Sequence, residues 1–312
     1  MCQEGGAKLH EDLGPVEGWI AYTSHTIGFV KGCFQPLPLL FYTPRIVDGR
    51  KTWILPRTVP PDEGLAAGRE PCLGGRETLL LRPGRARLES PVAAAKRLRS
   101  CSTRLCRAAL QLLDELRAYT ELAGVTGGLA YNPAGAGDID IVVYGTGIEE
   151  VYKLLQDLRI EGVTRPYHGR GHGWSRADME LNRAIAGDRV LIGYMGGFEY
   201  NVKLVPCRRP ARCTPIRILA EGALVRGVLR PVSPYTVPAL YKLELEKPLR
   251  LGLGSYNWIY LLTHRLRYTE MPRGLRVEVL GDIEHFEGSV RLVPDHGGYV
   301  KPLNHRPGPV RP

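Results

Sequence analysis

The chain has 312 residues and a formal net charge of +10, from 42 Lys and Arg residues against 32 Asp and Glu residues. Apolar residues make up 44% and charged residues 24% of the sequence, which excludes a chain that is disordered throughout. No window approaches the about 18 apolar residues of a membrane span, and the first residues lack the apolar stretch of a signal peptide. We therefore expect a soluble, cytoplasmic, basic protein without a membrane partner, whose positive surplus favours an anionic partner such as a nucleotide or nucleic acid.

Seven cysteines are spread along the chain without a C-x2-C spacing. An odd count without the spacing of zinc ligands argues against a disulfide scaffold and against a zinc finger. We expect these cysteines to be structural thiols and assign them no chemistry.

Short apolar runs broken by Pro and Gly predict a β-rich segment over residues 1–88. Residues 41–47 and 51–55 flank Asp48-Gly49, a pair typical of a two-residue hairpin. A loop is predicted between Thr58 and Gly75, where Pro, Gly and acidic residues gather.

Helical and extended patterns alternate over residues 89–210. Ser90-Pro91 predicts a helix start, and apolar residues at helical spacing continue to about Leu122, with an interruption near Ser100 to Thr103. The segment from Ile139 to Tyr144 is apolar and rich in β-branched residues, which predicts a buried strand. Helices are further predicted over 148–158 and 176–186, and strands over 189–194 and 198–205.

The C-terminal part is predicted to be a β domain. Residues 207–215 are rich in Arg and Pro and are interpreted as a linker. About five strand-like segments follow, which predict a small, OB-like β domain over 211–303 and leave 304–312 as a disordered tail. Aromatic residues alternate there with cations, which fits a stacking surface for single-stranded nucleic acid, although packing within the sheet explains the same pattern. These residues are Tyr235, Tyr241, Tyr256, Trp258, Tyr260 and Tyr268 with Arg226, Arg230, Lys242, Arg265 and Arg267.

The most informative stretch carries two glycines followed by two aspartates. Gly127 and Gly128 form a turn, and Asp138 and Asp140 follow at the start of the predicted strand. Two carboxylates two residues apart on a strand project from one face and repel each other, so a hard divalent cation stabilises them. We expect Mg²⁺ (or Mn²⁺) at the two aspartates and the glycine backbone beside a triphosphate. A turn cap and a solvated strand residue remain the alternative reading of the same pair.

This stretch resembles the signature of the DNA polymerase β-like nucleotidyltransferase superfamily, and its fuller wording is similar to a family of archaeal predicted nucleotidyltransferases. The resemblance implies an α/β (α+β) fold, with a polymerase β-like core at 89–210 between the β-rich N-terminal segment and a small C-terminal barrel-like domain. It also implies attack of a hydroxyl on the α-phosphate of a nucleoside triphosphate. In that family two metal ions are held by the D-x-D pair and by a third carboxylate on a neighbouring strand.

The third carboxylate has no clear counterpart in this sequence. Lys203 lies where an acid is expected, so we regard it as a candidate for contacting a phosphate. Glu199 is the nearest acid and the candidate third catalytic residue, with Glu221 as an alternative. Two functions therefore stay open: a Mg-dependent nucleotidyltransferase with an unknown hydroxyl acceptor, or a catalytically degenerate nucleotide- or RNA-binding protein. The sequence does not indicate an oligomeric state.

A Gly-rich cationic loop at 167–174 is a weaker candidate for holding a triphosphate or nucleic acid. It contains His168, Arg170 and His172 and is followed by Arg176. A zinc site at the two histidines is not expected, because no further ligand follows at a suitable spacing.

Overall fold

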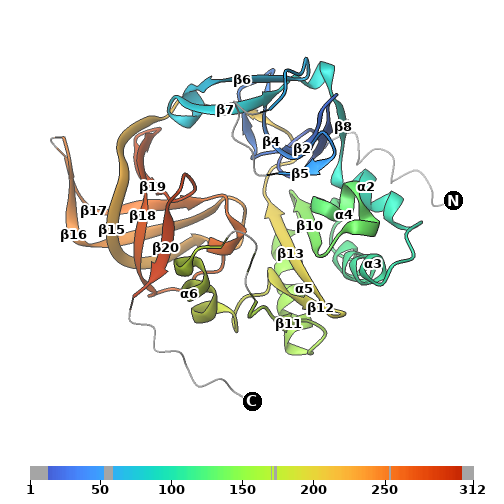
Figure 1. Cartoon of the computed structure of the whole chain (residues 1–312). Coiled ribbons are helices and arrows are strands. Elements are labelled where there is room, and N and C mark those ends of the chain that lie inside the picture. Colours follow the sequence, from blue (N-terminus) through green and yellow to red (C-terminus); the bar gives the residue numbers. More distant parts are fainter. Residues whose placement is uncertain (1–12, 53–58, 170, 172–173, 253, 304–312) are drawn as a thin grey trace. The chain divides into compact units, whose positions relative to one another are not determined.

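The computed structural model describes residues 13–52, 59–169, 171, 174–252 and 254–303 (Figure 1). The chain divides into two compact units, the first made of residues 1–158 and 194–215 and the second of residues 159–193 and 216–312. The predicted N-terminal segment 1–88 lies in the first unit, whereas the predicted core 89–210 is shared between the two. The predicted tail, 304–312, lies outside the described residues.

An antiparallel sheet forms the N-terminal part of the first unit, with the strand order β6-β7-β4-β2-β1-β8 and with β5 added to β4. Its strands are β1 (Ile20–Tyr22), β2 (Thr26–Val30), β4 (Leu40–Val47), β5 (Arg50–Lys51), β6 (Leu65–Glu70), β7 (Arg76–Leu81) and β8 (Arg87–Glu89). The hairpin at Asp48-Gly49 is confirmed, because β4 and β5 pair across it and both residues have positive φ. Residues 53–55 of its second arm lie outside the described residues. The predicted loop from Thr58 to Gly75 is wrong in part, because β6 pairs along its length with β7.

A second sheet carries the aspartate motif. Within it β10 (Ile139–Tyr144) lies between β13 (Phe198–Val205), which runs parallel to it, and β9 (Ala123–Val125), which runs antiparallel. The strand β12 (Ile192–Met195) follows β13 in the strand order. The predicted strands at 139–144 and 198–205 are thus confirmed.

Three helices of the first unit begin and end close to the predicted positions: α2 (Pro91–Leu98), α3 (Arg104–Arg117) and α5 (Ile148–Ile160). The short helix α4 (Gly127–Tyr131) begins where a glycine turn was predicted. The side chains of Ser90 and Thr103 cap α2 and α3 by accepting hydrogen bonds from the N–H groups of Ala93 and Cys106. The interruption predicted near Ser100 to Thr103 is therefore real, because a second cap starts a new helix there.

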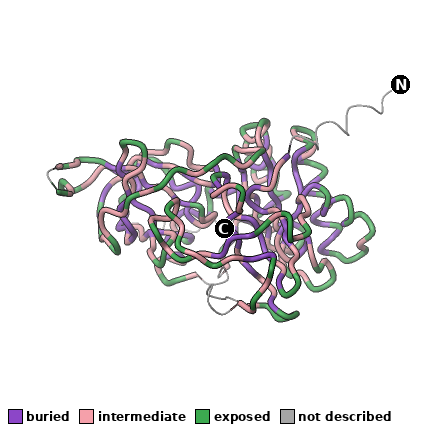
Figure 2. Tube along the Cα trace, turned by 90° about the horizontal axis from the view of Figure 1, so that it is seen from above, coloured by how far each residue is buried: buried purple, intermediate pink, exposed green. Residues whose placement is uncertain are grey.

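The face of β10 that carries Asp140 is covered by the segment that precedes β1. Val142 and Tyr144 lie on that face, two and four residues after Asp140, and both are fully buried. They pack in one cluster with Leu13 and Val16. Figure 2 shows buried residues mainly in the inner parts of the trace and exposed residues mainly in its outer turns. The segment before β1 therefore packs against the strand that carries Asp140.

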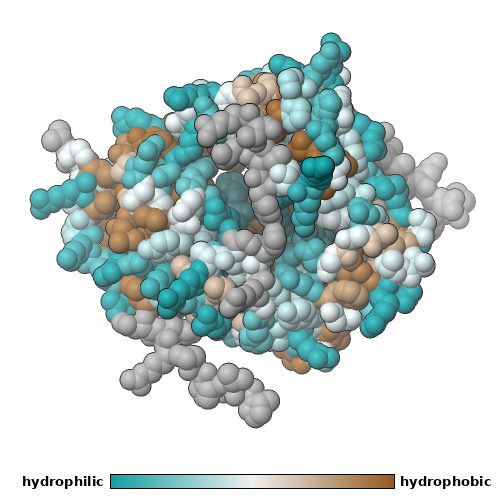
Figure 3. Space-filling model, viewed as in Figure 1, coloured by the Kyte–Doolittle hydropathy of each residue, from teal (hydrophilic) through white to brown (hydrophobic). Residues whose placement is uncertain are grey.

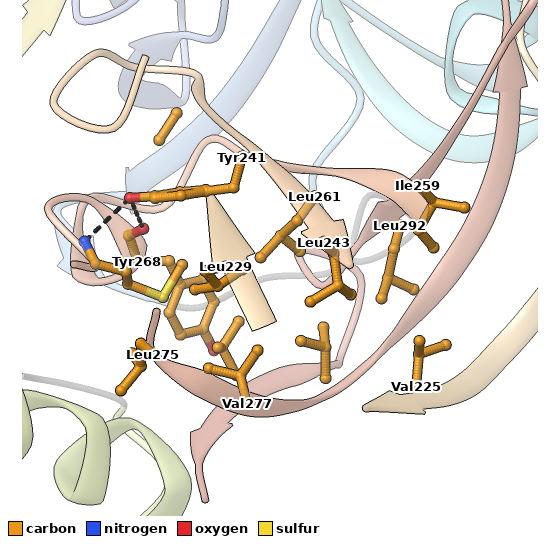
Figure 4. Packing of buried hydrophobic residues seen from close by; sticks show 14 of the residues in the cluster. Val225, Leu229, Tyr241, Leu243, Ile259, Leu261, Tyr268, Leu275, Val277 and Leu292 are labelled. Carbon is orange, nitrogen blue, oxygen red and sulfur yellow. Dashed lines mark hydrogen bonds between the residues drawn. The ribbon is translucent and has the colours of Figure 1, made fainter. Parts of the chain in front are cut away.

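A six-stranded sheet forms most of the second unit. Its strands are β15 (Arg217–Ser233), β16 (Ala239–Leu251), β17 (Gly254–Thr263), β18 (Arg276–Phe286), β19 (Ser289–Val293) and β20 (Tyr299–Pro302). The helix α6 (Arg176–Ile185) also belongs to this unit, while the short β11 (Arg165–Pro166) pairs with β12 at the edge of the second sheet. The order is β15-β16-β17-β19-β18-β20, and β15 also pairs with β18, so five strands form a closed ring. Apolar side chains fill the inside, where the Tyr241 hydroxyl donates a hydrogen bond to the Tyr268 carbonyl at 3.0 Å (Figure 4).

The predicted fold class is wrong. Strands prevail over helices, the described residues hold five α-helices, and the strands form several separate sheets. The protein is therefore mostly β, and is not an α/β protein with a polymerase β-like core and a small barrel. The reason is that both flanking segments form larger sheets than predicted, since β15 alone has 17 residues and residues 65–81 form a hairpin.

Three disulfides correct the interpretation of the cysteines as free thiols. They are Cys33–Cys207, Cys72–Cys213 and Cys101–Cys106. The first two bonds hold the predicted linker 207–215, in which β14 (Ala211–Arg212) also pairs in parallel with β3 (Phe34–Gln35). These partners are 174 and 141 residues apart in the chain, so they meet only in the fold.

Candidate functional site

The two aspartates of the motif lie at the start of β10. Asp138 directly precedes the strand, and Asp140 is its second residue. In the parallel pairing with β13, Asp140 lies beside Asn201 and Val142 lies beside Lys203. Residues in register share one face of a sheet, so Asp140, Asn201 and Lys203 project from the same side. The Asn201 side chain forms a hydrogen bond to the Asp140 carboxylate.

The glycine turn lies directly against the Asp140 side chain. Gly127 has a φ of +63°, and a Cβ there would lie 2.7 Å from Cγ of Asp140, closer than real Cβ contacts. The N–H of Thr126 donates a hydrogen bond to the carbonyl oxygen of Asp140 at 2.9 Å, which holds the turn beside the strand. Gly128 differs, because its Cβ would meet Ala136 at an ordinary 3.6 Å. The close approach therefore requires glycine at position 127.

The pKa of the Asp140 carboxyl group is raised, and the causes of this rise bear on metal binding. Burial and the negative charge of Asp138 raise the pKa of Asp140 to about 6, against the opposing effects of Lys203, Asn201 and Arg45. A divalent cation would offset both causes. Its positive charge would counter the charge of Asp138, and its bonds to the carboxylate would replace the water that burial removes. Two carboxylates are hard oxygen donors, and this pair fits Mg²⁺ or Mn²⁺.

A buried glutamate, which the sequence analysis missed, lies next to this motif. Glu17 Oε1 accepts hydrogen bonds from Nζ of Lys203 at 2.6 Å and from Nζ of Lys31 at 3.4 Å. Its Oε2 accepts from the N–H of Gly32 at 2.9 Å, and the side chain is 4% exposed. Burial by itself would raise the pKa of Glu17, but the two lysines and Gly32 hold that pKa below its ordinary value.

The backbone around Glu17 is fixed to the aspartate motif by two hydrogen bonds. The Tyr144 hydroxyl donates to the carbonyl oxygen of Glu17 at 2.7 Å, and Thr126 Oγ1 donates to that of Gly18 at 2.8 Å. Both donors belong to the strand and turn of the motif. No local pattern marks Glu17, because it is a single acid before the first strand, far from residue 140 in the chain.

Lys203 connects Glu17 with Asp140. Burial acts to lower the pKa of Lys203, but Glu17 and Asp140 together raise it, so this lysine is charged. Arg45 on β4 is a second cation that the sequence analysis missed, and Asp140 and Glu17 favour its charged form against the effect of burial. The site thus balances three carboxylates with three cations before any ligand binds. The carboxylates are those of Glu17, Asp138 and Asp140, and the cations are those of Lys31, Arg45 and Lys203.

The predicted third carboxylate is not brought into a common ligand set. Glu199 lies on the same face of β13 as Asn201, two residues earlier. Within the described ranges, no group of three possible ligands close enough to share a metal ion includes Asp138 or Asp140. Glu221 is an exposed residue of β15 in the second unit. The sequence analysis chose Glu199 because it is the nearest acid, whereas the strand register places Asn201 beside Asp140.

Other candidate residues have less support. In the loop 167–174, His168 is exposed, and Arg170 and His172 lie outside the described residues. Arg176 is bound to Glu180 at 3.0 Å. Glu70, Cys72 and Cys213 form the one three-residue group of possible metal ligands in the described part of the chain, but the two sulfurs are joined in a disulfide.

The comparisons with known proteins give no family. No protein-family model matches the sequence, and no curated protein is significantly similar to it. None of the helices in the described part of the chain is long and apolar enough to cross a membrane. The function is therefore argued from the geometry of the site.

Proposed function

We propose that the first unit binds a nucleoside triphosphate as its Mg²⁺ complex. The observation that carries this proposal is the approach of Gly127 to the Asp140 carboxylate, which joins the glycine turn and the aspartate pair into one site. Asp138 and Asp140 would hold the ion, which takes its other ligands from water and phosphate oxygens. The spacing of Gly127, Gly128, Asp138 and Asp140, which resembles that of nucleotidyltransferases, favours a nucleotide over other anions.

The cations of the site support a phosphate ligand. A triphosphate carries more negative charge than one Mg²⁺ neutralises, so further cations are needed beside it. Lys203 and Arg45 both interact with Asp140 and thus lie on the side where the ion would bind. These two cations favour a ligand that is still negatively charged after it has bound the ion.

Nucleotidyl transfer is the second candidate function. It is favoured by the strong interaction of the two carboxylates, since Asp138 raises the pKa of Asp140. One carboxylate could hold the ion while the other accepts a proton. The oxygen of an acceptor hydroxyl would form a bond to the α-phosphorus, the bond to the β-phosphate oxygen would break, and pyrophosphate would leave. Transfer ranks second because a lysine and an asparagine stand on the face where a two-metal mechanism needs a third carboxylate.

Equilibrium dialysis with α-labelled ATP, GTP, CTP and UTP tests the binding proposal. We expect at least one nucleotide to bind in the presence of Mg²⁺ and to be lost in EDTA and in an Asp138→Asn/Asp140→Asn variant. A Glu150→Gln/Asp157→Asn variant removes the same charge from exposed positions of α5 and serves as the control. Equal binding by all three proteins would contradict the proposal.

The same labelled nucleotides distinguish binding from transfer. They are incubated with RNA, DNA and total protein as acceptors, with Mg²⁺ or Mn²⁺. Label that enters an acceptor in the wild type and not in the double aspartate variant establishes transfer and names its acceptor class. Binding without transfer in all of these mixtures supports the binding function alone.

A further inference from the structure

A row of cations crosses the outer face of the sheet in the second unit. Arg230 on β15 lies opposite Lys242 on β16, and Lys242 lies opposite Tyr260 on β17. Tyr260 in turn lies beside Arg291 on β19. These four residues, here called the cationic row, share one face because in-register neighbours on adjacent strands project from the same side. That face is the outer one, since the alternate residues of the same strands are buried in the core: Leu229, Leu243, Ile259 and Leu292.

An exposed tryptophan lies beside the cationic row. Trp258 is 42% exposed, which is unusual for so large an apolar side chain. Its ring meets the ring of Tyr260 edge-on, with 5.3 Å between centroids, and Nζ of Lys242 lies 4.6 Å from its centroid. Figure 3 shows apolar residues among hydrophilic ones over the sheet of this unit. The exposed part of the indole is available for a flat apolar ligand.

The arrangement of charges on this face favours an anionic ligand. Like charges directly opposite each other destabilise a sheet, and Arg230 and Lys242 form such a pair. The nearby acids are engaged by arginines, with Glu244 bound to Arg230 and Glu284 bound to Arg291, each at 3.0 Å. Each of these pairs cancels one positive and one negative charge, so the net positive charge of the row is that of Lys242.

The second unit also carries most of the positive surplus of the chain. It holds 20 of the 42 Lys and Arg residues and 13 of the 32 Asp and Glu residues, which is a surplus of seven out of the total of ten. A polyanion is attracted to such a surface before specific contacts form.

We propose that Trp258 and the cationic row bind single-stranded nucleic acid. A base stacks on the exposed part of Trp258, and backbone phosphates lie along Lys242 and Arg230. Stacking on an aromatic ring beside a positively charged track is how proteins hold single strands without reading their sequence. All of these residues belong to the second unit, so the inference does not depend on the nucleotide site of the first.

Fluorescence anisotropy of labelled 12-residue oligo(U) and oligo(dT), at several salt concentrations, tests this proposal with the full chain. We expect Trp258→Ala to weaken binding about tenfold and Trp258→Phe to retain most of it, because a stacking ring remains. Lys242→Gln should weaken binding and make the salt dependence shallower by about 0.7 in the slope of log K against log salt. Lys301→Gln on β20, whose ammonium lies 3.9 Å from Glu180, removes the same charge elsewhere and should change affinity less than twofold.

Three results would overturn the proposal. The wild type could bind neither oligonucleotide, or Trp258→Ala could bind as tightly as the wild type. Inorganic polyphosphate could also displace the oligonucleotides as well as an unlabelled strand of equal charge does, which would indicate an anion site without stacking. Binding of either oligonucleotide with the expected variant effects supports the proposal. Because Trp258 is exposed, the variants should keep the wild-type melting temperature, which circular dichroism checks.

Discussion

The backbone of Gly127 lies so close to the carboxylate of Asp140 that no side chain fits between them. This contact links the first residue of the helix α4 with the strand β10, across the loop between them. It places the turn, the strand and the charged network of Glu17 around one carboxylate, and the following predictions depend on this arrangement.

Replacing Gly127 with alanine should disrupt the site, whereas the same change at Gly128 should not. The Gly127→Ala variant forces a Cβ into Asp140 at a φ of +63°, so we expect a loss of about 2 kcal/mol of stability and at least a tenfold loss of Mn²⁺ affinity. Gly128→Ala adds a methyl group at ordinary contact distance inside α4, where alanine is favoured over glycine, and should leave the stability unchanged or raise it by up to about 1 kcal/mol. Urea unfolding and Mn²⁺ titration measure both effects. Equal behaviour of the two variants would show that the close approach has no role.

The raised pKa of Asp140 predicts a pH-dependent gain from neutralising it. Because this pKa rises from 3.8 to about 6 on folding, the stability that comes from the protonated acid is complete below about pH 4 and is lost as the pH rises through 6. Asp140→Asn stays neutral, so without divalent cations it should be more stable than the wild type above pH 6 by roughly 2–3 kcal/mol. The difference should vanish near pH 4. Urea midpoints between pH 4 and 8 test this, and a constant difference would contradict it.

Glu17 should be far more important for stability than an exposed glutamate. Glu17→Gln leaves Lys203 and Lys31 without their shared counter-charge, and breaking such a buried pair costs about 3–5 kcal/mol. Glu63→Gln breaks an exposed pair with Arg85 and should cost at most about 1 kcal/mol. Since the pKa of Glu17 is lowered, its contribution is complete above its ordinary pKa of 4.5 and declines as the pH falls below it. Similar unfolding midpoints for both variants at pH 7 would contradict this assignment.

The disulfides should differ in their contribution to stability according to the loops they close. The Cys33→Ser/Cys207→Ser variant opens a long loop and should lose about 4 kcal/mol, even though Cys72–Cys213 still joins the same regions. The Cys101→Ser/Cys106→Ser variant opens a loop with a separation of five residues and should lose about 2 kcal/mol. Melting temperatures with and without a reductant measure the difference. A larger loss in the second variant would contradict the assignment.

Local features of the motif could be predicted from the sequence. The strand from Ile139 to Tyr144 is indicated by its β-branched residues between glycines, and the cap at Ser90 follows from short-range hydrogen bonding. The positions of Gly127 and Asp140 near each other also follow from a turn and a strand that are close in the chain. Such features depend on neighbours within a few residues, so their pattern is visible in the sequence.

Long-range features could not be predicted in the same way. Glu17, Lys31 and Arg45 reach the site from the N-terminal segment, and no spacing relates them to residue 140. The neighbour of Asp140 could not be predicted for a related reason, because only the register of β10 with β13 shows that this neighbour is Asn201. The fold class was missed because sheet content depends on pairings between distant segments, such as β15 with β18.

The most direct test of the central claim is a Mn²⁺ titration followed by electron paramagnetic resonance, with and without a nucleoside triphosphate. The account predicts that the wild type binds one Mn²⁺ per chain, more tightly when the nucleotide is present. It also predicts that Asp138→Asn/Asp140→Asn loses this binding while Glu150→Gln/Asp157→Asn retains it. Undiminished Mn²⁺ binding in the double aspartate variant, or no binding in the wild type with any of the four nucleotides, would contradict the claim.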